Sequence, residues 1–381
     1  MSNVRIGHRA ALTAVIVAFI AGLAGSLAIR PPGGVEHGAA AIASGRTQRI
    51  HWRMPVAFQT TMPTIGDNPV YVTDMIYAVS GDGVRLEIFE PGEVVPAFSI
   101  LDAVRDGKVE AGYTWLGYDQ GKIPASVLLG AVPFGMEPWE FSAWWFEAGG
   151  RELGEALYEK YNAYPLFCGL TGPETAGWFR SRIDSLDDIR GLKIRFAGLG
   201  GKVIERLGAS VTMLPGGEIF QALEKGAIDA TEWVAPYNDL AFGFHKVAKF
   251  YYAPGVHEPG PALGLTINTK AFEELPADLQ AIVKRAAGDE ALRMLCEMTV
   301  GNAEALGVLL GKYNVQLRRF PREVYGAMLT AGADVAREAA EKDPFTRKVY
   351  ESWQGFRKKI IELSPLTELG YMALRDAQRL V

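Results

Sequence analysis

The sequence predicts a two-lobed α/β fold that ends in a long helical segment. Strand-like and helix-like stretches alternate between residues 50 and 234, and one combination of helix end, glycine and strand occurs twice in that range. The last third of the chain has apolar residues at helical spacing. With 381 residues, of which 49% are hydrophobic, the chain is long enough to form two hydrophobic cores.

Residues 1–30 differ in composition from the rest of the chain. Arg5 and Arg9 precede an uncharged, mainly apolar run over residues 10–29 that contains small residues near its end. This order is typical of an export signal peptide. A run of about 20 residues is also long enough to remain as an uncleaved membrane anchor. Residues 31–49 are rich in Gly, Pro and Ala and predict a flexible linker to the mature domain.

Residues 50–170 are expected to form mainly the first lobe. An alternating stretch that turns apolar predicts its first strand, and Gly107 predicts the end of a helix that lies between two further strands. A strand, a helix and a strand at this spacing form the βαβ unit of a parallel sheet. The expected elements are strands over 50–59, 85–90 and 109–118 and a helix over 91–108.

Residues 171–270 are expected to form mainly the second lobe. Strands are predicted over 165–172, 192–198, 209–215 and 228–234, and helices over 201–208 and 216–227. The stretches "AVRDGKVEAGYTW" and "ALEKGAIDATEW" share a helix end, a glycine, an apolar residue, an acid and an alanine, which indicates two similar lobes. Ligands bind at the carboxyl ends of parallel strands. The pattern therefore places Tyr113 at a cleft from one lobe, and Glu232 and Trp233 from the other.

Residues 271–381 are expected to be helical. Helices are predicted over 275–313, 322–342 and 343–363, the last of them opened by Asp343 and Pro344. This segment is expected to complete the first lobe. Its closing helix is rich in apolar and aromatic residues, so it is suited to cap a lobe or to pack on a second copy of the chain.

Charge and motifs argue against several function classes. The net charge of −5 gives no basic surplus for binding nucleic acid. The sequence contains no GxSxG, HExxH or P-loop motif and no Cys/His spacing of a zinc site. His257 beside Glu258 leaves a general base as an alternative. Cys168 and Cys296 lie far apart in sequence, and export would permit a disulfide, while two free thiols are the other interpretation.

Four charged residues stand at predicted strand ends. Arg195 follows strand residues that look like core, and its planar fork suits a carboxylate. The alternative is an edge strand with this side chain in solvent. Glu174, Glu232 and Glu258 are either solvated surface carboxylates or a converging set. Converging carboxylates repel one another unless a cation or a shared proton offsets them, and hard cations prefer oxygen ligands.

Four stretches resemble the extracytoplasmic solute-binding subunit of TRAP transporters, the DctP family, in particular its branch that binds 2-oxo acids such as pyruvate. They are "TGPETAGWFR", "LDDIRGLKIRFAGLGGKVIERLGAS", "EIFQALEKGAIDATEWVAPYND" and "ELPADLQAIVKRAA". The resemblance covers the chain from about residue 50 onward. It implies a type II periplasmic-binding-protein-like fold with mixed sheets, whose lobes are joined by crossing strands and a long helix. It also implies a periplasmic location, a membrane permease as partner, and possible dimerisation by exchange of the last helix.

The resemblance further implies roles for individual residues. Arg195 would clamp the substrate carboxylate, and a bound sodium or calcium ion would bridge to the substrate. The implied substrate contacts are Arg195, Glu174, Trp233, Tyr113 and Asn238, and the implied cation ligands are Glu232, Glu258, Glu174 and the carbonyl of Trp233. Two other classes stay open: a metal-dependent lyase acting on oxo acids, and a binding protein that serves a sensor or another transporter.

Glu174 departs from the pattern of this branch, which implies a glutamine at that position. Three carboxylates and the substrate carboxylate would then face Arg195 and one cation. Sodium would leave two negative charges without compensation, and calcium would leave one. Uncompensated charge in a closed cleft is unfavourable, so the sequence favours a divalent ion unless Glu174 is protonated or turned away.

Overall fold

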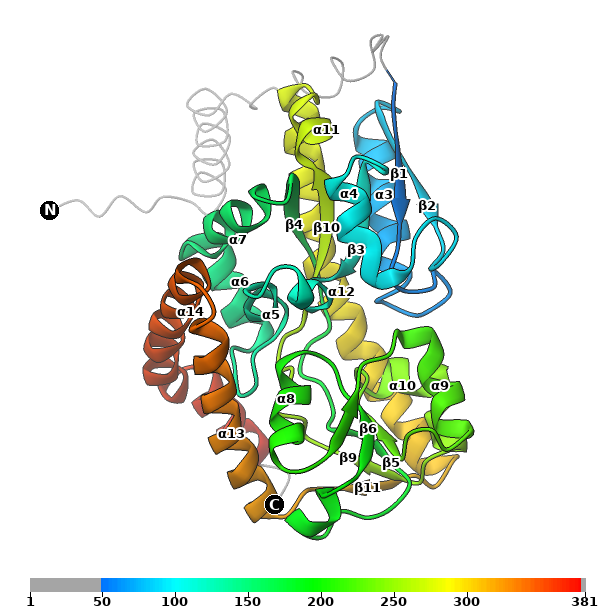
Figure 1. Cartoon of the computed structure of the whole chain (residues 1–381), viewed down its shortest axis with the longest axis vertical. Coiled ribbons are helices and arrows are strands. Elements are labelled where there is room, and N and C mark those ends of the chain that lie inside the picture. Colours follow the sequence, from blue (N-terminus) through cyan, green and yellow to red (C-terminus); the bar gives the residue numbers. More distant parts are fainter. Residues whose placement is uncertain (1–48, 378–381) are drawn as a thin grey trace, which may run out of the picture. The chain divides into compact units, whose positions relative to one another are not determined.

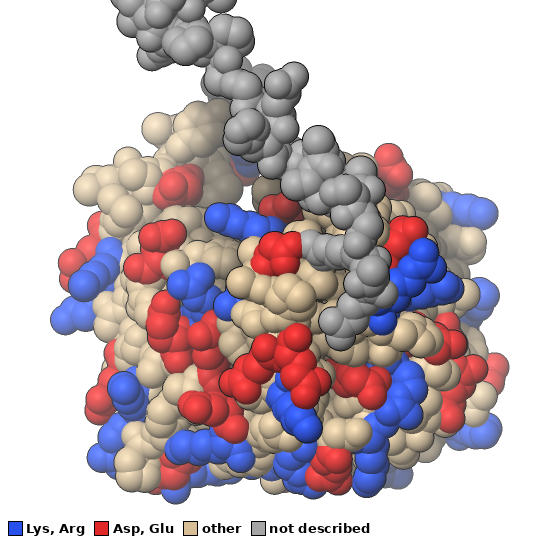
Figure 2. Space-filling view, turned by 90° about the horizontal axis from the view of Figure 1, so that it is seen from above, with Lys and Arg blue, Asp and Glu red and all other residues tan. Residues whose placement is uncertain are grey.

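The computed structural model describes residues 49–377 of the chain (Figure 1). The signal or anchor expected over residues 1–30 lies outside this range, as does the linker expected over 31–49 apart from its last residue. Within the described range, no helix is long and apolar enough to cross a membrane. Figure 2 shows acidic and basic side chains interspersed over the face in view, so neither sign dominates there.

The first lobe is built on a mixed sheet made of two segments. β1 and β2 pair in parallel, while β10 pairs antiparallel with both β3 and β4. A parallel bridge between Val56 and Tyr113 joins the two segments. The expected parallel arrangement of the first three strands is confirmed. The bounds are β1 (Ile50–Pro55), β2 (Val84–Phe89), β3 (Ala111–Trp115), β4 (Ala163–Leu170) and β10 (Ala262–Asn268).

The second lobe is built on a six-stranded mixed sheet in the order β11-β9-β5-β8-β6-β7. β6 is parallel to both β7 and β8, and β5 is antiparallel to β8 and β9. All its strands are short. They are β5 (Gly177–Phe179), β6 (Lys193–Arg195), β7 (Ser210–Thr212), β8 (Ala230–Thr231), β9 (Phe250–Tyr252) and β11 (Gln316–Arg318).

Helices flank both sheets (Figure 1). Those before β4 are α3 (Asn68–Val79), α4 (Ile100–Arg105), α5 (Ser126–Gly130), α6 (Pro138–Glu147) and α7 (Gly150–Glu159). Those of the second lobe are α8 (Gly198–Arg206), α9 (Gly216–Glu224) and α10 (Pro236–Phe242). The remaining helices are α11 (Thr269–Glu273), α12 (Ala277–Gly311), α13 (Arg322–Ala340), α14 (Pro344–Leu363) and α15 (Glu368–Ala377).

The long helix α12 connects the two lobes. Its 35 residues span about 50 Å at a rise of 1.5 Å per residue. It packs on β4 and α3 in the first lobe and on α10 in the second, and Figure 1 shows it running from one lobe to the other. Leu279, Val283 and Ala287 are buried at four-residue spacing along it. The predicted long helical segment is therefore present, and it serves both lobes.

Several of the expected elements are shorter than predicted. The helix expected over 91–108 is reduced to a 3-10 turn (Ala97–Ser99) and α4. Gly92 takes the left-handed φ of +90°, and Pro96 has extended backbone immediately before the turn, so the stretch between them cannot be helical. The strand expected over 109–118 ends at Trp115, where a 3-10 helix (Leu116–Gly121) begins. The expectation also omitted α3, which links β1 to β2.

The start of α14 agrees with its sequence signals. The Asp343 carboxylate accepts hydrogen bonds from the backbone N–H groups of Phe345 and Thr346, each at 2.9 Å. Pro344 occupies the first turn, where its missing N–H has no partner to lose. Cys168 is buried and Cys296 is exposed, and both are free thiols.

Two loops carry the chain from one lobe to the other. Residues 171–176 lead from β4 to β5, and residues 253–261 lead from β9 back to β10. β4 pairs with β10 in the first lobe, and β5 pairs with β9 in the second. β10 thus lies in the range expected to be mainly second lobe but belongs to the first sheet. The resemblance implied crossing strands and a long helix. The strands that these two loops connect, together with α12, correspond to them.

Candidate functional site

Arg195 and Glu232 form a buried ion pair at the ends of two adjacent parallel strands. Arg195 ends β6 and is paired in register with Thr231 of β8, so the next residue of that chain, Glu232, lies beside it. Arg195 Nη1 donates to Glu232 Oε1 at 2.5 Å, and both side chains are 2% exposed. The backbone N–H of Ala197 donates to the same oxygen at 2.6 Å. The interpretation of Arg195 as a solvated edge residue is therefore wrong.

The other faces of the guanidinium are also defined by contacts. Arg195 Nε donates to the carbonyl of Leu214 at 3.2 Å. Its guanidinium carbon lies 5.2 Å from the centre of the Trp233 ring, a distance suited to a cation–π interaction. Burial raises the pKa of Tyr118 to about 12, and the nearby Arg195 charge acts in the opposite direction. Arg195 is thus held rigidly, with its charge facing the space between the lobes.

Glu174 and Glu258 approach this pair from the two crossing loops. Glu174 lies in the 171–176 loop and Glu258 in the 253–261 loop, and both are buried. The loops are tied together, because the backbone N–H of Glu174 donates to the Glu258 carbonyl at 3.2 Å. Thr171 Oγ1 donates to Glu174 Oε1 at 3.4 Å. These carboxylates are therefore not solvated surface groups.

The convergence of carboxylates shifts their proton equilibria. Burial, followed by the charges of Glu258 and Glu232, raises the pKa of Glu174 well above its ordinary value. Burial and then Glu232 raise the pKa of Glu258 in the same way. Burial also raises the pKa of Glu232, although Arg195 opposes the change. One guanidinium does not neutralise three buried carboxylates, so the arrangement favours an additional positive charge or a shared proton.

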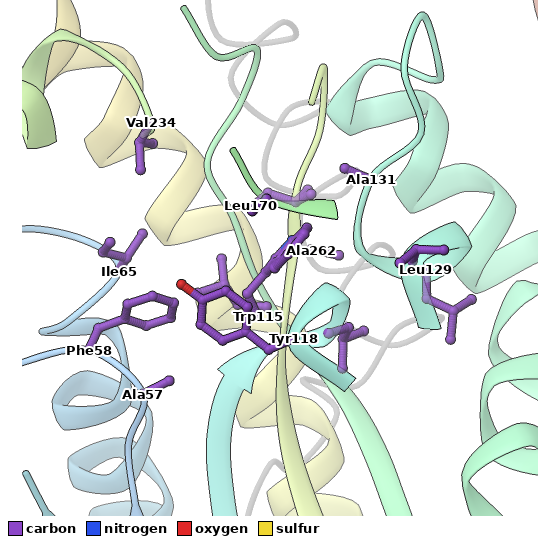
Figure 3. Packing of buried hydrophobic residues seen from close by; sticks show 14 of the residues in the cluster. Ala57, Phe58, Ile65, Trp115, Tyr118, Leu129, Ala131, Leu170, Val234 and Ala262 are labelled. Carbon is purple, nitrogen blue, oxygen red and sulfur yellow. The ribbon is translucent and has the colours of Figure 1, made fainter. Parts of the chain in front are cut away.

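Aromatic and aliphatic side chains from both lobes close a small cavity around these charges. Figure 3 shows Phe58, Trp115 and Tyr118 grouped together, with Ile65 beside Phe58. The Phe58 and Tyr118 ring centres are 5.8 Å apart, and those of Trp115 and Tyr118 are 5.3 Å apart. The full lining is Phe58, Ile65, Trp115, Tyr118, Thr171, Glu174, Arg195, Ala197, Glu232, Trp233, Val234, Glu258, Pro261 and Leu263.

The cavity encloses about 40 Å³. A water molecule needs on the order of 10–15 Å³ on this measure, so the space suits a molecule of a few heavy atoms. A larger groove of about 550 Å³ lies along α8 and α13, with Lys202, Arg206 and Glu338 on its walls. Its charged residues are exposed rather than buried. The small cavity is therefore the candidate site, since it alone of the two gathers buried charges.

The donor set suits a cation. One ligand atom each from Glu174, Glu232 and His257 lie within 4.8 Å of one another, and all three residues are buried. Glu174 Oε2 and His257 Nε2 have no hydrogen-bond partner although both atoms are inaccessible to solvent. Buried polar atoms without partners are unfavourable, and an ion placed among them would satisfy both. Burial and then Arg195 lower the pKa of His257 to about 3, which makes its proposed role as a base unsuitable at neutral pH.

Two of the expected substrate contacts do not line the cavity. Tyr113 is fully buried in β3, and burial, followed by Cys168 of β4 and Glu290 of α12, raises the pKa of its hydroxyl well above the ordinary value. Asn238 donates to the carbonyl of Pro63 at 2.7 Å, so it ties α10 to a loop of the first lobe.

Several cavity residues were not singled out from the sequence. Phe58, Ile65 and Tyr118 come from the first lobe, where they look like ordinary strand or loop residues. The sequence indicates only an alternative base at His257, whereas the structure groups it with Glu174 and Glu232 in a cluster with the geometry to hold a metal ion. A glutamate neighbour and a Pro/Gly-rich loop were the only signals for His257. No local signal marks the three apolar residues, because their place in the cavity depends on the approach of the other lobe.

Comparison with known proteins now places the chain in a family. The sequence matches the bacterial extracellular solute-binding proteins of family 7, DctP, over residues 64–343. A monocarboxylate 2-oxoacid-binding periplasmic protein of Nostoc sp. is 39% identical over 323 residues, which cover 84% of this chain and 88% of the relative.

Solved structures of TRAP solute-binding proteins share the fold. The protein of Pseudoalteromonas atlantica, with bound sodium and pyruvate, and that of Colwellia psychrerythraea, with bound calcium and pyruvate, are each 34% identical with a TM-score of 0.82. Each match covers 86% of this chain and 99% of the other. A dimeric protein of Bordetella bronchiseptica, with co-purified calcium and picolinate in one site and an apo site, is 32% identical with a TM-score of 0.84, over 88% of this chain and 100% of that one.

The expected two-lobed binding-protein fold is confirmed by these structures. The alternative of a metal-dependent lyase is set aside, because the family is one of transport proteins rather than enzymes. The family match over most of the chain, with a relative 39% identical over 84% of it, shows that this chain belongs to the DctP family of extracytoplasmic solute-binding proteins of TRAP transporters.

Proposed function

We propose that this protein captures a small 2-oxo monocarboxylate such as pyruvate between its lobes, using Arg195 and a bound cation together. The observation that carries the proposal is the buried guanidinium facing Glu174, Glu232 and Glu258 in a cavity of about 40 Å³. The guanidinium contacts the substrate carboxylate, and the cation bridges the carboxylates to the substrate oxygens. The pyruvate carried by two relatives 34% identical to this chain supports this ligand class.

The cation is held by oxygen atoms of Glu174, Glu232 and Glu258 and by the carbonyl of Trp233. Electrostatics supports a divalent ion. Burial and then neighbouring carboxylates raise the pKa of Glu174 and that of Glu258, so each added positive charge stabilises their ionised forms. The relatives carry sodium in one structure and calcium in another, which shows that this fold accommodates either.

The apolar walls favour a short, uncharged tail. Phe58, Ile65 and Leu263 surround the charged groups and exclude water from them, which strengthens each charged contact. A second carboxylate on the ligand would meet these side chains and stay unpaired, at a large cost in desolvation. A monocarboxylate is therefore favoured over a dicarboxylate.

Calorimetry with pyruvate in calcium-containing buffer tests the arginine contact. Arg195→Lys keeps the charge but loses the planar fork, and we expect the Kd to rise about tenfold to a hundredfold, the equivalent of ~1.5–3 kcal/mol for a charged hydrogen bond. Arg182→Lys is the control, since that arginine is exposed in the second lobe and pairs with Asp184. Unchanged affinity in Arg195→Lys, in a variant that circular dichroism shows to be folded, contradicts the contact.

A thermal-shift screen of small carboxylates, with and without sodium or calcium, tests the ligand class. A ligand that binds only the folded form raises the unfolding temperature by mass action. We expect stabilisation by pyruvate and close 2-oxo acids only when a cation is present. Stabilisation by an uncharged solute alone would contradict the proposal.

The loaded, closed form delivers its ligand to the membrane permease of a TRAP transporter from the periplasm. Lobe closure on ligand is the usual two-state response of two-lobed binding proteins. Membership of an extracytoplasmic family supports both the partner and the compartment.

We further propose that two copies associate through the C-terminal helices. α15 has no buried residue, and Leu366, Leu369, Tyr371 and Leu374 are all exposed around it. Exposed apolar patches of this kind mark interaction sites, and the relative from B. bronchiseptica is a dimer. Sedimentation should show a dimer, and Leu366→Glu with Leu374→Glu should shift it to monomer. A monomeric wild-type protein at micromolar concentration contradicts this association.

A further inference from the structure

His257 lies at the cation-binding cluster, although it was not among the expected ligands. It precedes Glu258 in the 253–261 loop and is 4% exposed. Its Nε2 is 3.4 Å from Glu174 Oε2, and neither atom has a hydrogen-bond partner. An oxygen of Glu232 lies within 4.8 Å of both. Two carboxylates and one imidazole thus point to a common volume.

The spacing of the two partnerless atoms fits neighbouring ligands of one ion. Metal–nitrogen and metal–oxygen distances of about 2.1 Å put two corners of a tetrahedron about 3.4 Å apart. An ion there would satisfy both atoms at once. A direct hydrogen bond would satisfy them only in part, because the second lone pair of Glu174 Oε2 would accept no hydrogen bond in a buried site.

Packing holds the imidazole in this position. The ring meets the edge of Phe196, with ring centres 4.8 Å apart and planes at 78°. A Cβ added at Gly200 would lie 2.7 Å from His257 Cβ, so the absence of a side chain at Gly200 allows the loop to approach α8. A side chain held at its ring by Phe196 and at its Cβ by the close approach of α8 is a preorganised ligand.

From this geometry we infer that His257 is a nitrogen ligand of the bound cation, so that the site prefers a transition-metal dication such as Mn²⁺, Co²⁺ or Zn²⁺ over sodium and calcium. The inference rests on the proposed function, since it concerns the cation of the same site. Imidazole suits first-row transition ions, whereas calcium and sodium take oxygen ligands. Calcium would use only the oxygen ligands, which are the carboxylates and the Trp233 carbonyl, and would bind more weakly.

Competition calorimetry and paramagnetic NMR test this ligand assignment. The full chain is stripped of metal and titrated with Co²⁺ or Ca²⁺ in the presence of pyruvate. We expect one Co²⁺ ion to bind at least tenfold more tightly than Ca²⁺, with paramagnetically shifted imidazole ring protons in the Co²⁺ form. His257→Gln should lose these signals and bring the Co²⁺ and Ca²⁺ affinities together. His245→Gln, at a partly buried histidine elsewhere in the second lobe, should keep both properties.

The outcomes separate this inference from the proposed function. Pyruvate binding that needs a cation, with no shifted imidazole signals in the wild-type Co²⁺ form, overturns the role of His257 and leaves the proposed function intact. Signals that persist in a folded His257→Gln variant overturn it as well. If that variant does not fold, the wild-type spectrum and the Co²⁺/Ca²⁺ preference still decide. Absence of pyruvate binding with every ion tested contradicts the proposed function itself.

Discussion

Glu174 shows how the surroundings of one side chain set its chemistry. A surface carboxylate would be ionised at neutral pH, but here burial, followed by the charges of Glu258 and Glu232, raises the pKa of Glu174. Its charge state therefore depends on what else occupies the site. The same residue is stable as an anion beside a dication and unfavourable without one.

The Glu174→Gln variant should be more stable than the wild type without a cation and should bind a cation more weakly. In chelator, the variant should unfold at a higher temperature than the wild type at pH 8, because a repulsive buried charge is gone. Its calcium affinity should fall about tenfold, the equivalent of about 1.4 kcal/mol. Thermal unfolding and calorimetry measure the two effects. Glu218→Gln on the exposed face of α9 should change neither, and equal calcium affinities in wild type and Glu174→Gln would contradict a role for its charge.

The sequence located the charged residues of the site but not its walls. Arg195, Glu174, Glu232 and Glu258 stood out because charges at the ends of apolar strands need a reason, and all four line one cavity. Phe58 did not stand out, because apolar residues are ordinary everywhere. Apart from Ile65, its neighbours in the cavity come from positions more than fifty residues away, and single-sequence patterns do not carry contacts of that range.

At the scale of elements, the strand ends position the site. β6 and β8 are only three and two residues long, yet their parallel register sets Arg195 against Glu232. β8 is in turn paired with β5, which is antiparallel to it. The sequence predicted these strands longer, because Phe196 and Val234 continue the apolar pattern although the backbone turns away to begin α8 and α10.

Gly177 is a position in a strand where a larger residue is strongly disfavoured. It opens β5 with φ of +105°, and an added Cβ would lie 2.2 Å from the Thr231 carbonyl oxygen. Gly177→Ala should lower the free energy of unfolding by at least about 2 kcal/mol, since the strained backbone alone costs on the order of 1–3 kcal/mol. Denaturant unfolding measures it. Gly326→Ala in α13, where an added Cβ meets nothing within 4 Å, should instead stabilise by about 0.5–1 kcal/mol, and equal effects at both sites would contradict this account.

At the scale of the whole molecule, the fold buries several carboxylates outside the candidate site. Burial is the main cause that raises the pKa of Asp67 to about 6 and those of Asp119 and Glu290 to about 7. The folded chain then holds protons that the unfolded chain has released. The stability that these three protonated carboxyl groups contribute is complete below pH 4 and is lost as the pH rises toward 7.

The free energy of unfolding should therefore rise as the pH falls from 8 to 5. Asp119→Asn isolates one contribution, because Tyr158, which donates to Asp119 Oδ2 at 2.9 Å, can still donate to the amide oxygen. The stability of this variant relative to the wild type should grow between pH 4 and pH 8 by up to about 4 kcal/mol, at 1.36 kcal/mol per pKa unit. Urea unfolding at several pH values measures it. A constant difference would show that Asp119 does not titrate in this range.

The fold class was predictable at this scale because two lobes leave repeated local patterns. The alternation of strands and helices, the long helical third and the repeated glycine–apolar–acid–alanine stretch are all short-range signals. The placement of β10 and β11 in sheets built by distant parts of the chain was not predictable in this way, since strand pairing over such distances has no local signature.

The two crossing loops have one more consequence. Each carries a carboxylate of the candidate site, Glu174 on one and Glu258 on the other, and these are the strips of backbone that must flex when the lobes separate. An ion bound by both carboxylates would hold the two loops together. By reciprocity, if closing raises the ion's affinity by some factor, the ion raises the closed population by that same factor. A permease that separates the lobes would then weaken the binding of the ion and that of the acid at the same time.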